Sequence, residues 1–265
     1  MRDNQPLRFA ILVEYDGTSY RGSQLQGNGS TIQGALERAL SSLTSEPVRV
    51  SLAGRTDAGV HARAQVASFL TGRRRAPDVI VRAANALLPR DIAVRAAAKV
   101  PLRFDPRRDA QSRWYRYTYC LGKTRPALLR NRVWHVGPAL DLQAMAGAAQ
   151  SLIGRHDFAA FAPSYQAKRG SSERVVCRAD IVGRGQLAFL DIEANAFLAH
   201  MVRRIAAAFA EVGQGKLGCE QFRSLVAEAR PGAAAATAPA RGLCLMKVRY
   251  EGGLFDDETD DDIQP

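Results

Sequence analysis

Apolar residues at alternate positions predict a strand at the start of the chain, because successive side chains of a strand point to opposite sides. Leu7 to Val13 follow this pattern and lead into Asp16-Gly17, a dipeptide typical of turns. Thr31 can cap a helix that carries a single apolar stripe. The first hundred residues are therefore predicted to run strand, helix, strand, strand, helix, strand, at about 7–13, 32–43, 48–52, 65–70, 77–87 and 92–100.

The second part of the chain continues this alternation of strands and helices. Residues 113–121 form a predicted strand with Trp114 on one face and Tyr115 on the other. Both parts combine sheet and helix, so we expect an α+β fold. The remaining elements are predicted as a helix at 142–154, strands at 173–183 and 186–195, helices at 196–213 and 219–229, and a last strand at 243–251.

We expect the chain to form two helix-backed subdomains with mixed or antiparallel sheets. The first, residues 1–105, has the element order of a split βαβ unit, as ferredoxin-like folds do. The second spans residues 106–254. Residues 255–265 are rich in Asp and Glu and are predicted to be a disordered tail.

The charge of the chain suggests a polyanionic partner. The net formal charge is +11, although the tail contributes several negative charges. A folded body this basic attracts nucleic acid. Arg73, Arg74, Arg75, Arg107 and Arg108 are candidate phosphate contacts, and an ordinary solvated surface is the alternative for each run.

Several classes of protein lack support in the sequence. No apolar run approaches the roughly 20 residues that span a bilayer, and the start of the chain lacks a signal-peptide core, so we expect a cytoplasmic protein. The four cysteines lie far apart and the four histidines lack ligand spacing, which argues against disulfides and a metal site. No phosphate-binding loop or nucleophile elbow occurs.

The segment GRTDAGVHA, residues 54–62, holds the most distinctive chemistry. If residues 54–57 continue the preceding strand, Arg55 and Asp57 project to one side. A nearby arginine keeps a carboxylate ionised, as a nucleophile or general base requires. A plain turn is the alternative, since Asp and Gly59 are ordinary turn residues. A single carboxylate does not fit a glycosidase, which pairs two.

Three tyrosines on one face of the 113–121 strand allow two interpretations. Tyr115, Tyr117 and Tyr119 could stack on bases, as aromatic residues do on the sheets of many RNA-binding proteins. The alternative is ordinary packing, which is more frequent for aromatic residues on strands.

An ordered set of motifs resembles one known family along nearly the whole chain. Besides GRTDAGVHA, the motifs are EYDGTSYRG, LPRDIAV, RFDPR, RWYRY, GRHDFAAF, ANAFLAHMVRRI and TAPARGL. Together they resemble the bacterial TruA family, the tRNA pseudouridine synthase I enzymes. The resemblance implies the pseudouridine synthase fold, with two subdomains that flank a central basic cleft.

The resemblance also implies roles for particular residues. Asp57 matches the catalytic nucleophile, and Arg203 matches the arginine that pairs with it. Tyr115 matches the tyrosine that packs on the target uracil, and Leu243 matches an apolar residue on its other side. Arg55 matches an arginine that contacts RNA and helps to hold the flipped nucleotide.

The implied activity is isomerisation of uridine to pseudouridine at positions 38 to 40 of tRNA, in the anticodon arm. The implied enzyme is a homodimer that needs no cofactor or metal. The sequence departs from the family pattern at Ser23, where a tryptophan is usual, and at Ala199, Arg204 and Ala207. These departures motivate an alternative, a non-catalytic tRNA-binding or RNA-chaperone protein with the same fold.

Overall fold

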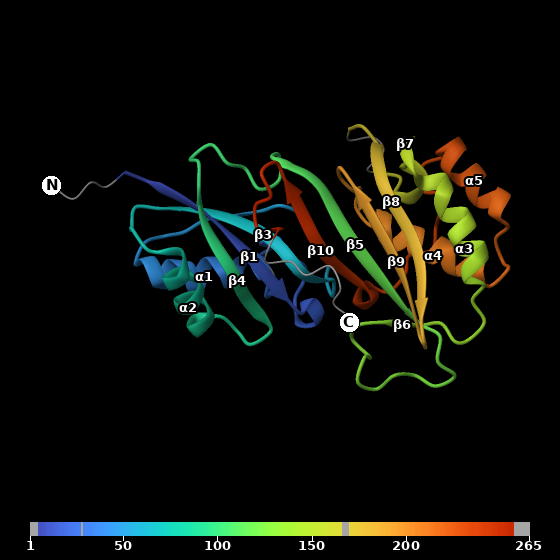
Figure 1. Ribbon diagram of the computed structural model, residues 1–265, viewed down its shortest axis with the longest axis horizontal. Coiled ribbons are helices and arrows are strands. Elements are labelled where there is room, and N and C mark those ends of the chain that lie inside the picture. Colours follow the sequence, from blue (N-terminus) through green and yellow to red (C-terminus); the bar gives the residue numbers. More distant parts are fainter. Residues whose placement is uncertain (1–4, 28, 166–169, 257–265) are drawn as a thin grey trace. The chain divides into compact units, whose positions relative to one another are not determined.

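The computed structural model describes residues 5–27, 29–165 and 170–256. The chain divides into two compact units (Figure 1). Unit 1 consists of Met1–Gln111 and Leu245–Pro265, and unit 2 consists of Ser112–Cys244. The acidic-tail prediction for 255–265 falls, beyond Asp256, outside the described residues.

Unit 1 is a sheet accompanied by two helices. Its strands run in the order β4 (Ile92–Val100), β1 (Leu7–Tyr15), β3 (His61–Thr71) and β10 (Leu243–Tyr250). Of β10, the part from Leu245 onward belongs to unit 1. The short strand β2 (Val50–Leu52) pairs with β3. β1 is antiparallel to both β3 and β4. Phe9 lies opposite Phe69 in this register, and their rings stack with centroids 5.8 Å apart.

The helices of unit 1 begin where the sequence predicts. α1 (Ile32–Thr44) is capped by Thr31, whose Oγ1 accepts a hydrogen bond of 3.2 Å from the Gly34 amide. Its apolar stripe buries Ile32, Leu36 and Leu40. α2 (Pro77–Leu87) starts at a proline and packs on α1 and β4 (Figure 1). A short 3-10 turn, η1 (Gly17–Ser19), follows β1.

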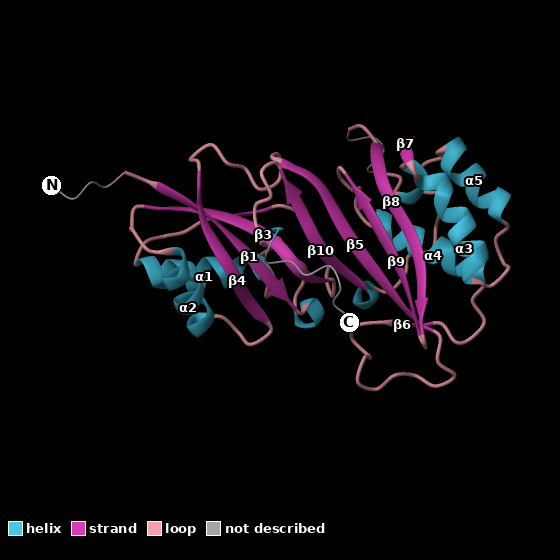
Figure 2. Cartoon of the chain, viewed as in Figure 1, coloured by secondary structure: helices cyan, strands magenta, loops and turns pink. Residues whose placement is uncertain are grey.

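Unit 2 combines further strands with three helices (Figure 2). Its strands run in the order β5 (Ala110–Cys120), β9 (Leu187–Ala194), β8 (Glu173–Arg184) and β7 (Gly154–Asp157). Of β5, the part from Ser112 onward belongs to unit 2. The pairs β5–β9, β9–β8 and β8–β7 are all antiparallel. β6 (Trp134–His135) adds a short parallel pair with β5. The α+β prediction is therefore confirmed.

The helices of unit 2 are α3 (Leu142–Ala149), α4 (Met201–Gly213) and α5 (Cys219–Glu228), and they pack on one another. Phe209 of α4 stacks on Phe222 of α5 with centroids 4.8 Å apart. The short 3-10 turns η2 (Gln150–Leu152), η3 (Ala159–Phe161) and η4 (Ala240–Gly242) complete the unit. Within the described ranges, no helix is long and apolar enough to cross a membrane.

Two predicted helices of unit 2 are shorter than expected. The prediction of one helix over 196–213 is wrong, because α4 begins only at Met201, after His200 adopts the left-handed conformation with φ of 60°. Asn195 binds the Val175 and Ala196 amides and holds the chain in an irregular path after β9. The helix predicted over 142–154 ends at Ala149, and Gly154 starts β7 with φ of +105°.

Candidate active site

The segment around Asp57 leaves the sheet before it reaches the carboxylate. β2 ends at Leu52, so residues 54–57 do not continue the strand, and the condition for Arg55 and Asp57 to project to one side is not met. Gln65, fully buried on β3, binds both backbone groups of Gly54: the Gly54 amide donates to Gln65 Oε1 (3.2 Å), and Gln65 Nε2 donates to the Gly54 carbonyl (2.8 Å). The Gln65 side chain therefore makes the two hydrogen bonds to the Gly54 backbone that a neighbouring strand would otherwise make.

Thr56 is held by hydrogen bonds to its amide, its carbonyl and its hydroxyl. Its amide donates to Ser23 Oγ at 2.8 Å, and its carbonyl accepts from the Ser23 amide at 3.0 Å. Its hydroxyl lies 2.8 Å from the hydroxyl of Tyr15, at the end of β1. Thr56 is buried, whereas Arg55 is exposed and Asp57 is half-buried. The contacts on Thr56 thus fix the backbone between these two charged residues.

A turn follows Asp57 directly. The Val60 amide donates to the Asp57 carbonyl at 3.2 Å, and Gly59 has φ of +79°, a conformation that favours glycine. His61 then begins β3 in a buried position, where its Nδ1 accepts from the Gly17 amide at 3.1 Å. The segment that carries Asp57 is therefore itself a turn, as the alternative interpretation of the sequence predicts.

Tyr115 lies in unit 2, on β5. It is largely buried and packs edge-on against Phe197, with ring centroids 5.2 Å apart. Phe197 belongs to the irregular segment before α4, so its contact with Tyr115 could not be predicted from helical spacing.

The other two tyrosines of the stripe serve packing. Tyr117 and Tyr119 are fully buried, and their hydroxyls donate to the carbonyls of Pro239 (2.9 Å) and Ala206 (2.8 Å). Burial raises the pKa of both phenols above the ordinary value, so they remain neutral donors. These two rings are not available to stack on bases.

Arg203, on α4, is bonded to the segment that leads to Leu243. Its Nε donates to the Ala238 carbonyl at 2.8 Å, and the Ala238 amide donates back to the Arg203 carbonyl at 3.1 Å. Arg204 Nη1 donates to the Ala234 carbonyl at 2.9 Å. Leu243 follows, buried at the start of β10. Unit 2 therefore organises Arg203 and Leu243 through one loop.

The predicted site residues are divided between the units: Arg55 and Asp57 belong to unit 1, and Tyr115, Arg203 and Leu243 belong to unit 2. Ser23 and Gln65, which hold the Asp57 segment, were missed as positioning groups. No periodicity marks them, because their bonds join residues 33 and 11 positions apart.

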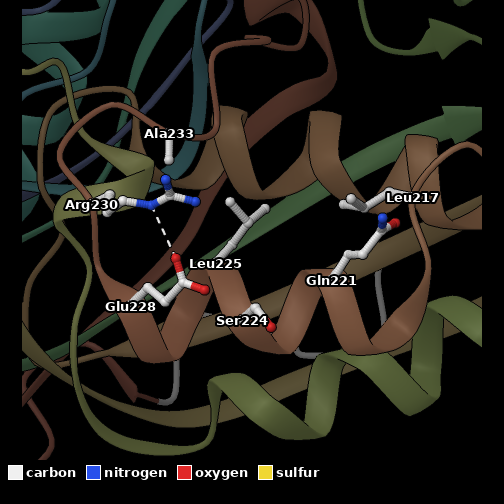
Figure 3. Close-up of a pocket in the computed structure, with 7 residues that line it drawn as sticks. All are labelled: Leu217, Gln221, Ser224, Leu225, Glu228, Arg230 and Ala233. Atoms are coloured by element: carbon white, nitrogen blue, oxygen red, sulfur yellow. Dashed lines mark ion pairs between the residues drawn. The ribbon is translucent and has the colours of Figure 1, made fainter.

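A pocket in unit 2, with a volume of about 260 Å³, lies beside α5 (Figure 3). The Arg230–Glu228 ion pair, 3.0 Å long, lies at its wall. None of the predicted site residues lines it; the lining consists of Leu217, Gln221, Ser224, Leu225, Glu228, Arg230 and Ala233. This pocket is therefore separate from the candidate site residues.

Comparison with known proteins confirms the resemblance. A family model described as tRNA pseudouridine synthase matches residues 11–108 and 148–251. The tRNA pseudouridine synthase A of Geobacter sulfurreducens is 45% identical over 240 residues, which cover 91% of this chain and 98% of that protein. The enzyme of the same name from Geotalea uraniireducens is 43% identical over 240 residues, with the same coverage. The chain belongs to the tRNA pseudouridine synthase family.

Proposed function

We propose that this protein isomerises uridine to pseudouridine in tRNA, with Asp57 as its catalytic carboxylate. The observation that carries the proposal is the construction of the Asp57 segment. Backbone groups of Gly54 and Thr56 are bonded to Gln65 and Ser23, which fixes the backbone immediately before Asp57. Such preorganisation suits a group that must meet a reacting base.

In the proposed reaction the N1–C1′ bond of uridine breaks and a C5–C1′ bond forms. The proton that C5 loses is balanced by the proton that N1 gains, so no oxidant, reductant or water is consumed. Asp57 acts either as a nucleophile or as a base in this exchange. One carboxylate is sufficient because the base returns to the same sugar.

The remaining residues are proposed to hold the flipped nucleotide. A base inside a stem-loop must leave its stack before an enzyme can act on it. Tyr115, supported at its edge by Phe197, and the apolar Leu243 suit the two faces of a uracil. Arg203 is proposed as the ion-pair partner of Asp57, and Arg55 as a contact to RNA.

We further propose that the target lies at positions 38 to 40 of the anticodon arm and that the enzyme acts as a cytoplasmic homodimer. The exposed runs Arg73–Arg75 and Arg107–Arg108 supply phosphate contacts. The family relationship and the net charge of +11 support this assignment.

The test is pseudouridine mapping on unmodified tRNA incubated with wild type, Asp57→Asn and Asp78→Asn. Asp78 is an exposed carboxylate on α2, paired with Arg82 at 3.3 Å, and controls for the loss of one charge in the same unit. We expect wild type and Asp78→Asn to modify positions 38 to 40, and Asp57→Asn to bind tRNA without turnover. Binding without modification by the wild type would instead establish the non-catalytic alternative.

A further inference from the structure

Ser23 is buried in a segment whose following residues face solvent. It is fully buried, whereas Gln24 and Leu25 are exposed. The segment is tied down before it, where the Tyr20 hydroxyl donates to Asp91 Oδ1 at 2.6 Å. On the other side of Ser23 the segment is bonded to α1, because the Gln33 amide in the first turn of that helix donates to the Ser23 carbonyl at 2.9 Å. Ser23 therefore lies in a segment of unit 1 that hydrogen bonds hold on both sides.

Ser23 binds Thr56 through two hydrogen bonds, one from its side chain and one from its backbone. Ser23 Oγ accepts from the Thr56 amide at 2.8 Å, and the Ser23 amide donates to the Thr56 carbonyl at 3.0 Å. The amide of Thr56 and the carbonyl of Thr56 flank its Cα, and that carbonyl belongs to the peptide bond that leads to Asp57. Ser23 thus fixes the backbone from which Asp57 projects.

The close approach of the two segments is built into the preceding residue. Gly22 has φ of +91°, and a Cβ there would lie 2.9 Å from the Thr56 carbonyl oxygen and 3.5 Å from the carbonyl carbon of Asp57. Only glycine allows this approach without displacement of the backbone. Gly22 and Ser23 together place a hydroxyl where the Thr56 amide needs an acceptor.

We propose that Ser23 is a positioning residue for catalysis, which sets the orientation of Asp57 through the Thr56 backbone. The inference rests on the proposed role of Asp57. Without the Ser23 hydroxyl the Thr56 amide loses its acceptor in a buried place, and the Arg55–Thr56 peptide, one residue before the peptide that leads to Asp57, can rotate towards another partner. A displacement of about 1 Å at a reacting group lowers turnover by about 100-fold. Substrate binding, which does not depend on this hydroxyl, is retained.

The test compares Ser23→Ala with Ser41→Ala. Ser41 lies on α1, and its Oγ accepts from the Val48 amide at 2.9 Å, so both variants delete a serine-to-amide bond in unit 1. We expect Ser23→Ala to lower kcat by about 10- to 100-fold with the Kd for tRNA within about twofold of wild type. Ser41→Ala should change kcat by less than about twofold. Ser23→Cys, which keeps a weak acceptor of similar shape, should give an intermediate kcat.

Asp57→Asn, measured beside these variants, separates the two proposals. If Asp57→Asn loses turnover but Ser23→Ala matches Ser41→Ala, the inference about Ser23 is wrong and the proposed role of Asp57 stands. If Ser23→Ala and Ser23→Cys lose tRNA binding in the same proportion as kcat, Ser23 is only structural and the inference is also wrong. Full turnover by Asp57→Asn would overturn the catalytic assignment itself.

Discussion

At the scale of single residues, the candidate site depends on side chains that satisfy backbone groups. Gln65 replaces a strand partner for Gly54, and Ser23 does the same for Thr56. Tyr117 applies the same principle in unit 2, where its hydroxyl bonds the Pro239 carbonyl. Buried backbone groups need partners, so each of these side chains holds a loop that no regular element holds.

Tyr117→Phe is expected to destabilise the protein by about 1 kcal/mol, because the Pro239 carbonyl loses its buried donor. The free energy of unfolding in urea measures this loss. Tyr165→Phe, on an exposed tyrosine of the same unit, is the control and should leave that free energy unchanged. Equal values for the two variants would contradict the structural role of the Tyr117 hydroxyl.

At the scale of elements, the RFDPRRD segment shows how a loop presents basic residues. Asp105 Oδ1 accepts from the amides of Arg107 (2.9 Å) and Arg108 (3.0 Å), which closes a turn before β5. The Arg108 amide and then the Arg107 amide, with the positive charges of Arg108 and Arg8, lower the pKa of Asp105 despite its partial burial. The ionised carboxylate thus stabilises the turn.

Since the folded pKa of Asp105 lies below its unfolded value of about 3.9, its charge stabilises the fold above that pH, and this contribution is lost as pH falls through the folded pKa. Asp105→Asn should therefore lower Tm at pH 7, and the difference from wild type should shrink below about pH 4. Thermal melts at pH 7, 5 and 3 measure this. An equal difference at all three values would show that the charge is irrelevant.

At the scale of the whole molecule, charge and family membership point to the same partner. The net charge of +11 favours a polyanion, and the family model matches most of the chain as a tRNA pseudouridine synthase. The exposed run Arg73–Arg75 lies between β3 and α2 in unit 1, where side chains can reach solvent. Long-range attraction and local phosphate contact can be separated, because only the latter depends on where the arginines lie.

Replacement of Arg73, Arg74 and Arg75 by Gln should reduce the slope of log K against log salt for tRNA binding by about 2 to 3, since each lost phosphate contact removes about 0.7 to 0.9. A triple variant with the same change of charge, Arg155, Arg184 and Arg223 to Gln, provides the control on exposed positions of unit 2. Equal slopes for the two variants would assign the effect to net charge alone.

The sequence by itself determined the local elements and the family. Thr31 caps α1, Pro77 starts α2, and the apolar stripe of α1 is buried, because these features depend on residues a few positions apart. The motif set centred on GRTDAGVHA identified the tRNA pseudouridine synthase family, because each motif consists of neighbouring residues and needs no knowledge of the fold.

Tertiary structure alone decided the contacts between distant segments. The left-handed His200 delays α4, and the chain returns from unit 2 so that Leu245–Tyr250 of β10 joins the sheet of unit 1. The bonds of Ser23 to Thr56 and of Gln65 to Gly54 likewise join segments that no periodicity connects. Such bonds form wherever folding buries a backbone group beside a suitable side chain, which is a property of packing in three dimensions.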